Sequence, residues 1–240
     1  MGLAIVLALL TFAATLAGGF FVLRFKSLPV ELIGFSAGIL VAVACFDLLP
    51  HGFEQFGFGA ILSSLAGYGL LYAWHHYRLK QDISHLDADT AGQADLGLLG
   101  AGTLVLHSLV DGVALGVGLS DGHTGLGVAL AIILHDFCDG VSTVTLVLRT
   151  RKDPVLARLF LAANAIAPVV GAVVVITLGL SEQSLDWLLT FFAGTFLYIG
   201  LHQLFPAALQ SAHDRLRGLS VGMSAAVGIL AGWGMTMPGS

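Results

Sequence analysis

The sequence predicts an all-α polytopic membrane protein with eight transmembrane helices and both termini on the extracytoplasmic side. Three observations predict this: the composition, the number of long apolar stretches and the placement of the basic residues. Of the 240 residues, 57% are hydrophobic and only 10% are charged, whereas about a quarter of the residues of a soluble domain are charged. Such an apolar composition leaves no segment for a sizeable soluble domain.

Eight stretches reach the length of about 20 mostly apolar residues that a spanning helix needs. They cover residues 3–23, 31–50, 58–77, 96–119, 125–148, 157–180, 186–209 and 219–237. We interpret the first stretch as a span and not as a cleaved signal peptide, because no basic segment precedes it. The connections are short except for residues 78–95, which are polar and which we expect to form a cytoplasmic loop.

The basic residues predict the orientation of these spans. All ten lie in or beside the loops that follow the first, third, fifth and seventh spans: Arg24, Lys26, Arg78, Lys80, Arg149, Arg151, Lys152, Arg158, Arg215 and Arg217. In a chain of eight alternating spans these positions share one side, which the positive-inside rule makes cytoplasmic. Both termini then lie outside, and the agreement of all ten charges supports the span count.

The fourth and fifth spans carry the same polar motif, a histidine followed four residues later by aspartate and glycine. Residues 107–112 read HSLVDG, and residues 135–140 read HDFCDG. Residues four apart share a helix face, and each histidine lies about ten or eleven residues, or roughly 16 Å, into its span. The two sets can therefore meet at one depth near mid-membrane. Ionisable groups at that depth are costly and indicate a functional site.

The motif pair favours a site for a divalent transition metal. Imidazole suits zinc, iron, copper and nickel, and carboxylates neutralise the charge of the ion. The expected ligands are His107, Asp111, His135, Asp136 and Asp139. Cys138 is a further candidate ligand with a soft sulfur atom. A hydrogen-bonded structural role is the alternative for each His–Asp pair, but two aligned pairs favour the metal.

Polar side chains on both sides of this site suggest a route through the membrane. The candidate entrance residues at the outer end of the second span are Asp47, His51 and Glu54. The candidate exit or cytoplasmic residues are His202, Gln203, His75, His76 and His85. The alternatives are interfacial residues at a helix end, a histidine that bridges helices and a solvated loop.

At these residues the sequence resembles the ZIP family of divalent metal transporters. The family motifs are typically His-Asn-x-Pro-Glu-Gly and His-Glu-x-Pro-Glu-Gly, and they match residues 107–112 and 135–140. The resemblance extends over the whole chain and includes the Asp-Leu-Leu-Pro ending of the second span at residues 47–50. It implies a metal site on spans 4 and 5, import into the cytoplasm, and movement of spans 1, 4, 5 and 6 against the others.

The chain departs from the family motifs at several positions. Val110 and Cys138 replace the two prolines, and aspartates replace the glutamates, so each carboxylate is one methylene shorter. Ser108 replaces the asparagine and is a poorer candidate ligand. Asn164, in the sixth span, is another candidate ligand, because that span contributes polar side chains to the site in some family members. The alternative for Asn164 is a hydrogen bond that bridges helices.

The sequence thus predicts a single transmembrane transporter domain over residues 1–240 that carries zinc, with iron, manganese and cadmium as alternatives. The metal is the transported substrate, and we expect no enzymatic activity and no organic cofactor. The other expected partners are the lipid bilayer and a second copy in a homodimer. Nucleic acid is not expected, because no basic patch is present. The short loops favour a prokaryotic cytoplasmic (inner) membrane.

Two other functions compete with transport. An intramembrane metal-dependent hydrolase is the first alternative, because histidine and aspartate can hold a zinc ion that activates water. A structural or receptor-like membrane protein with buried polar pairs is the second. The mid-membrane depth of the motifs, with polar residues on both sides of them, favours transport.

Overall fold

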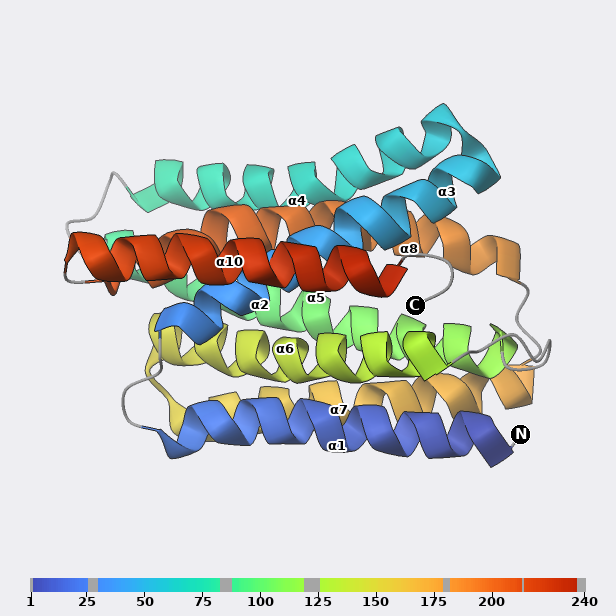
Figure 1. The fold of residues 1–240 in the computed structure, drawn as a ribbon. Helices are drawn as coiled ribbons and strands as arrows, with labels where there is room; N and C mark the ends of the chain where they lie inside the picture. The colour runs from blue at the N-terminus through green and yellow to red at the C-terminus, as the bar shows by residue number, and fades with distance from the viewer. Residues whose placement is uncertain are drawn as a thin grey trace.

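The chain folds into long helices that run roughly alongside one another (Figure 1). The computed structural model describes residues 2–25, 30–82, 88–118, 126–178, 182–212 and 214–236, and no strand occurs among them. The helices are α1 (Gly2–Arg24), α2 (Val30–Val43), η1 (Ala44–Leu48), α3 (Leu49–Phe56), α4 (Phe58–Asp82), α5 (Ala88–Gly118), α6 (Leu126–Arg151), α7 (Pro154–Leu178), α8 (Glu182–Tyr198), η2 (Ile199–Leu204), α9 (Phe205–Gln210) and α10 (Arg215–Thr236).

These elements form eight continuous rods in the described ranges, because α2, η1 and α3 follow one another without a break, as do α8, η2 and α9. Five segments are long and apolar enough to cross a membrane: Val6–Arg24, Val30–Phe56, Pro154–Val174, Asp186–Gln210 and Arg215–Gly234. The predicted all-helical, polytopic membrane architecture is confirmed at this level. The expected loop at residues 78–95 is shorter than predicted, since α4 continues to Asp82 and α5 begins at Ala88.

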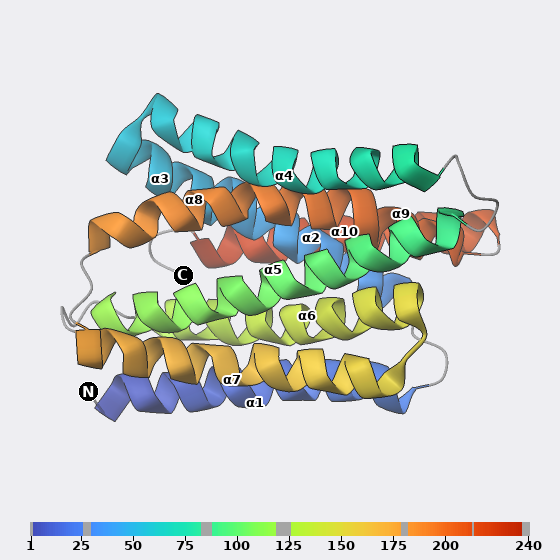
Figure 2. The same ribbon diagram turned by 180° about the vertical axis from the view of Figure 1, so that it is seen from behind.

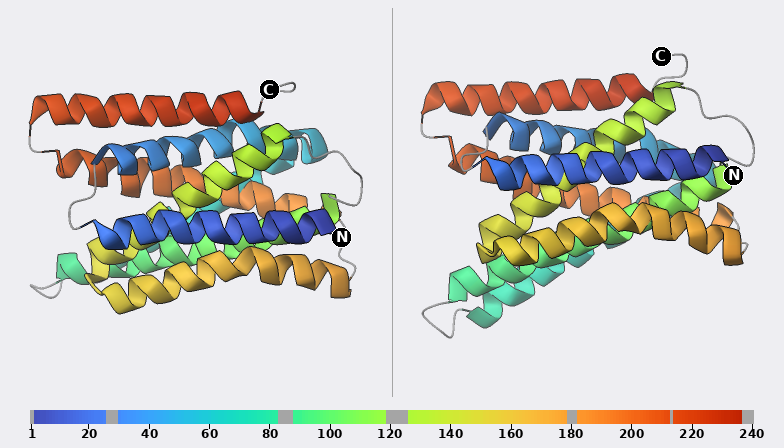
Figure 3. Two further views of the ribbon diagram at one scale, coloured as in Figure 1. Left: turned by 60° about the horizontal axis from the view of Figure 1, so that its bottom comes forward. Right: turned by 90° about the horizontal axis from the view of Figure 1, so that it is seen from below.

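The rods divide into two bundles of four. The first bundle contains α1, α5, α6 and α7, and the second contains α2 to α4 and α8 to α10, with their π-helical segments. Figures 1 and 2 show the first bundle in the lower half of the molecule and the second above it. Figure 3 shows α6 running obliquely to α1 and α10. The bundles meet where α2 and α6, α4 and α5, and α5 and α8 pack together.

Glycines bring the helices within each bundle into backbone contact. A Cβ on Gly112 of α5 would overlap the carbonyl of Pro168 in α7, and a Cβ on Gly171 of α7 would overlap the carbonyl of Leu109 in α5. The same close approach to a backbone carbonyl occurs at Gly18, Gly140, Gly38, Gly228, Gly67 and Gly194. Each of these contacts joins two helices of the same bundle, and no described glycine makes such a contact between the two bundles. Small residues let membrane helices pack closely, so each bundle is tightly joined internally.

Two π-helical segments interrupt the long rods just before Pro50 and Pro206. In each, the residue before the proline donates its N–H to the carbonyl five positions earlier: Leu49 to Ala44, and Phe205 to Gly200. Proline lacks an N–H donor and disturbs the regular helical bonding of the preceding turn. Single π turns are frequent at functional sites. The segment η1 contains Asp47, and η2 contains His202 and Gln203.

Candidate metal site

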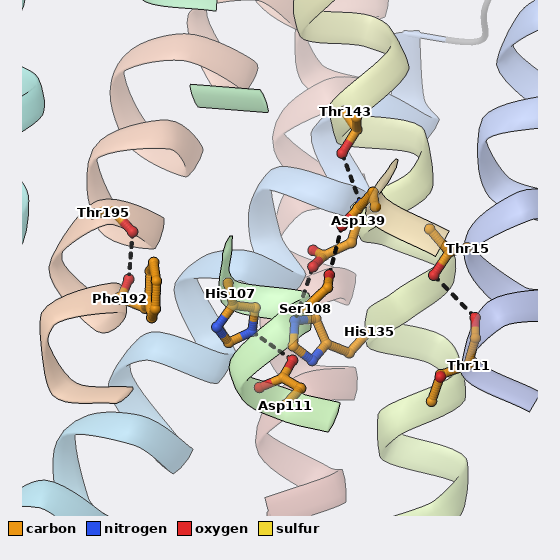
Figure 4. Close-up of polar contacts among 11 residues, drawn as sticks. Thr11, Thr15, His107, Ser108, Asp111, His135, Asp139, Thr143, Phe192 and Thr195 are labelled. Carbon is orange, nitrogen blue, oxygen red and sulfur yellow. Dashed lines mark hydrogen bonds and ion pairs between the residues drawn. The ribbon is translucent and has the colours of Figure 1, made fainter. Parts of the chain in front are cut away.

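The structure brings three of the predicted ligands to one point. The nearest ligand atoms of His107, His135 and Asp139 all lie within 4.8 Å of one another. His107 comes from α5 and the other two from α6, and the two imidazole rings have centroids 5.3 Å apart. Figure 4 shows the rings close together beside the aspartates. Ligand atoms around one zinc ion lie about 3–4 Å apart, so small side-chain movements would enclose an ion.

Each histidine lies next to the aspartate one helical turn further on. His107 Nε2 is 2.8 Å from Asp111 Oδ2, and His135 Nε2 is 3.5 Å from Asp139 Oδ2. The His107 contact is short enough for an ion pair. Both ring nitrogens of His107, Nε2 of His135 and both carboxylate oxygens of Asp139 are buried without a hydrogen-bond partner. Each buried group left in this way costs about 1–3 kcal/mol. A bound cation would satisfy one ligand atom from each of these three side chains.

Two more carboxylates enlarge the negative charge of this cluster. Asp136 is 2% exposed, and its Oδ2 has no hydrogen-bond partner. It is close enough to Asp111 and Asp139 for electrostatic interaction. The Asp111 side chain is 23% exposed and is the most accessible of the three. Buried charges require compensation, and a divalent cation fits this donor set.

Ser108 and Asn164 belong to a hydrogen-bonded chain beside the cluster. The Ser108 hydroxyl donates to Asn164 Oδ1 at 2.6 Å, and Asn164 Nδ2 donates to the Thr143 hydroxyl at 2.9 Å. All three side chains are fully buried. Asn164 therefore ties α7 to both α5 and α6, as the helix-bridging alternative requires. Ser108 keeps the lone pairs of its oxygen free for another partner.

Cys138 is buried on α6, but its sulfur is not among the clustered ligand atoms. Its thiol faces the hydroxyl of Ser36 in α2. The structure therefore places Cys138 at the contact between the two bundles, beside the cluster of ligands.

Two phenylalanines of the second bundle close one side of the cluster. The Phe196 ring packs edge-on against His107 with centroids 4.2 Å apart, and Phe192 lies 5.4 Å from the same imidazole. Phe196 also contacts the His135 ring at 5.8 Å. Sequence reasoning missed both residues, because phenylalanine is common in apolar spans and nothing in its spacing distinguishes these two.

The candidate entrance residues do not all approach the cluster. Asp47, in η1, is close enough to Asp111 and His107 for electrostatic interaction. His51 interacts with Asp47 but also contacts Asp186 of α8, with Nε2 3.2 Å from Oδ1. Glu54 is exposed on α3. Asp47 is therefore the member of this set that connects to the cluster.

Three candidate exit residues line a pocket of about 290 Å³ at the predicted cytoplasmic end. This inner pocket is lined by His75, Gly97, Leu146, Arg149, Thr150, His202, Gln203, Leu204, Pro206, Ala207 and Gln210. His75 Nδ1 is 2.7 Å from the Tyr198 hydroxyl, and His202 Nε2 is 2.6 Å from the Tyr68 hydroxyl. His76 is exposed on α4 outside the pocket, and His85 lies outside the described residues.

Comparisons with known proteins identify similar zinc transporters. A family model described as the ZIP zinc transporter matches residues 74–237. Human zinc transporter ZIP4 is 31% identical over 129 residues, which are 53% of this chain and 20% of that protein. Zinc transporter ZIPB of Bordetella bronchiseptica is 25% identical over 248 residues, covering 94% of this chain and 76% of its own length. A putative zinc transporter of Arabidopsis thaliana is 27% identical over 187 residues, covering 75% of this chain and 30% of that protein.

Proposed function

Because the chain belongs to the ZIP zinc transporter family, we propose that it imports divalent transition metals, chiefly zinc, into the cytoplasm. Iron, manganese and cadmium are alternative substrates. Family membership supports transport of metal ions, and the apolar helices support an integral membrane location. The relatives are named as transporters, which favours transport over the hydrolase alternative. A homodimer and a prokaryotic inner membrane stay predictions.

The unpartnered imidazole and carboxylate atoms carry the proposal of a binding site on α5 and α6. Their side chains are buried where a polar group normally has a partner, and they belong to residue types that bind zinc. We assign the ion to His107, His135 and Asp139, with Asp111 and Asp136 as the nearest additional carboxylates. Metal binding requires deprotonated ligands, so protons compete with the ion.

The placement of the termini and basic residues supports the proposed orientation. In Figure 1, α1 begins and α10 ends toward the same side of the molecule, as an even number of crossings requires. The basic residues Arg24, Arg149 and Arg215 lie at the opposite helix ends. The positive-inside rule assigns that opposite end to the cytoplasm. Ions would then enter near Asp47 and leave through the inner pocket.

The two bundles suggest how the site is exposed to each side in turn. All proposed ligands belong to the first bundle, whereas Asp47, Phe192 and Phe196 belong to the second. Close glycine contacts join helices within bundles and not between them in the described ranges. A movement of the first bundle against the second would carry the ligands past the side chains of Phe192 and Phe196. This arrangement supports a carrier mechanism. A small displacement at the contact between the bundles would switch access to the metal site from one side of the membrane to the other.

The proposal is tested by zinc uptake into proteoliposomes. Wild-type protein should accumulate zinc, and the His135→Ala, Asp139→Ala double variant should not. Thr195→Ala is the matched control, because Thr195 is buried in α8 and bonds only to the Phe192 carbonyl. Equal uptake by the double variant and the wild type would remove His135 and Asp139 from the binding site. If the wild type carries neither zinc nor iron nor manganese, the proposed function fails.

A further inference from the structure

Unpartnered polar groups extend beyond the metal site along the contact between the two bundles. Outside the proposed ligands, the described residues whose buried polar atoms have no hydrogen-bond partner are Ser36, Ser142, Thr145 and Gln203. Together they form a row of polar groups, which we call the polar track, that leads from Asp139 to the inner pocket.

Two of these residues follow Asp139 along α6, each a neighbour of the one before it. Ser142 and Thr145 follow Asp139 at spacings of three residues, and Arg149 continues the series at the end of the helix. Residues three or four apart are neighbours on one helix face. Ser142 and Thr145 are fully buried, whereas Arg149 lines the inner pocket. This succession of polar residues along α6 therefore connects the metal site to the inner pocket.

The other two residues face this track from the second bundle. The Ser36 hydroxyl of α2 faces the thiol of Cys138, which lies one turn before Ser142. Gln203 of η2 lies against α5, where a Cβ on Gly100 would be 2.8 Å from its Oε1. Gln203 also lines the inner pocket. The polar groups thus lie at the bundle contact, with members on both sides.

The hydroxyls of this track differ from other buried hydroxyls of the protein. A serine or threonine in a helix usually bonds to a carbonyl three or four residues earlier. Thr11, Thr15, Thr103, Thr190 and Thr195 all do so. Ser142 and Thr145 do not, although each unpaired hydroxyl costs about 1–3 kcal/mol. Unpaired buried groups of this kind indicate a partner such as water or an ion.

We propose that this track is the release route of the ion, an inference that rests on the proposed transport function. When the bundles separate at their inner ends, water enters beside Ser142 and Thr145 and the partly hydrated cation passes along them to the Gln203 amide. Neutral oxygen ligands hold transition metals more weakly than imidazole does, so the ion is not trapped. The described lining of the inner pocket contains no carboxylate, so the pocket lacks the anionic ligands that would hold a cation most strongly.

Cysteine labelling tests whether the track becomes hydrated. Ser142→Cys and Thr145→Cys are compared with Val144→Cys and Val147→Cys, four positions on α6 that are all fully buried. The wild type gives the background from Cys45 and Cys138. A charged, membrane-impermeant methanethiosulfonate is added from the cytoplasmic face. Reaction requires access of the reagent to a thiolate, so we expect track positions to react about tenfold faster than the valine positions. Equal rates at all four positions would overturn the proposal.

Transport measurements supply a second test. The Ser142→Ala, Thr145→Val double variant should lower zinc uptake several-fold while leaving equilibrium zinc binding in detergent unchanged, because the ligands remain. Unchanged uptake would overturn the release route, and a parallel loss of binding would place the hydroxyls in the site instead. A wild type without metal uptake would refute the proposed function, whereas the labelling pattern depends only on hydration of the track.

Discussion

Replacing Gly112 by alanine should destabilise the protein, whereas the same change at Gly102 should stabilise it slightly. Both glycines lie in α5. A Cβ on Gly112 would overlap the carbonyl of Pro168 in α7, while a Cβ on Gly102 would meet no atom within 4 Å. Both substitutions replace glycine by alanine in the same helix. They differ in the space available to the added methyl group.

The expected magnitudes follow from this difference in space. Non-bonded heavy atoms in contact are about 3.5–4.0 Å apart, so α5 and α7 must separate by on the order of 1 Å to admit the methyl group at Gly112. Overpacking of this kind costs about 1–3 kcal/mol. In a helix, alanine is favoured over glycine by about 0.8–1.0 kcal/mol. We expect a net loss of up to about 2 kcal/mol for Gly112→Ala and a gain of up to about 1 kcal/mol for Gly102→Ala.

Thermal unfolding in detergent measures both effects. For a chain of this size, 1 kcal/mol corresponds to about 2–4 °C in Tm, so the two variants should move in opposite directions from the wild type. Gly112→Ala should also reduce zinc uptake, since Asp111 lies on the same turn. A Gly112→Ala variant as stable as Gly102→Ala would refute the close α5–α7 contact and the tightly joined first bundle inferred from it.

Other predictions concern the site itself. Asp139→Asn should raise the Tm of the metal-free protein, because it removes an acidic group that is buried close to Asp136 and Asp111, and should abolish the rise in Tm on adding zinc. Zinc affinity should fall as the pH drops from about 7.5 to about 5.5, because protons compete with the ion for imidazole and carboxylate ligands; equal affinity at both values would contradict binding by these groups. Phe196→Ala should weaken zinc binding through a mobile His107 ring, with Phe196→Leu intermediate. Asn164→Ala should cost about 2–4 kcal/mol, because it strands the Ser108 and Thr143 hydroxyls, and an unchanged Tm would exclude the bridging role.

Hydropathy predicted the fold because every helix that crosses the bilayer needs about 20 mostly apolar residues. It did not predict how far the helices continue beyond the apolar stretches, since backbone hydrogen bonds also hold polar residues in a helix. Residues 78–82 of α4 and 88–95 of α5 are of this kind. Pro50 and Pro206 are visible in the sequence, but the π-helical turns before them depend on how the chain accommodates a missing donor, and the sequence does not determine that.

The two halves of the candidate site could be located because each is local. His107 with Asp111, and His135 with Asp139, share a helix face by their spacing alone. The contacts between bundles could not be predicted, because they depend on packing between residues far apart in sequence. Phe196 against His107 is one example. The role of Asn164 is another, since ligation and helix bridging both fit an isolated amide, and only its two hydrogen bonds favour bridging.

The metal site lowers the stability of the protein, whereas the close helix packing of the first bundle raises it. Buried carboxylates and imidazoles without hydrogen-bond partners lower the stability of the metal-free protein. Hydrogen bonds to other groups of the chain would occupy the atoms that bind the ion. The glycine contacts around them supply compensating packing, and Gly112 and Gly140 directly follow Asp111 and Asp139. If this relation holds, Asp139→Asn should rescue the stability that Gly112→Ala removes without rescuing zinc uptake. A double variant that recovers both would mean that the carboxylate is not the binding group.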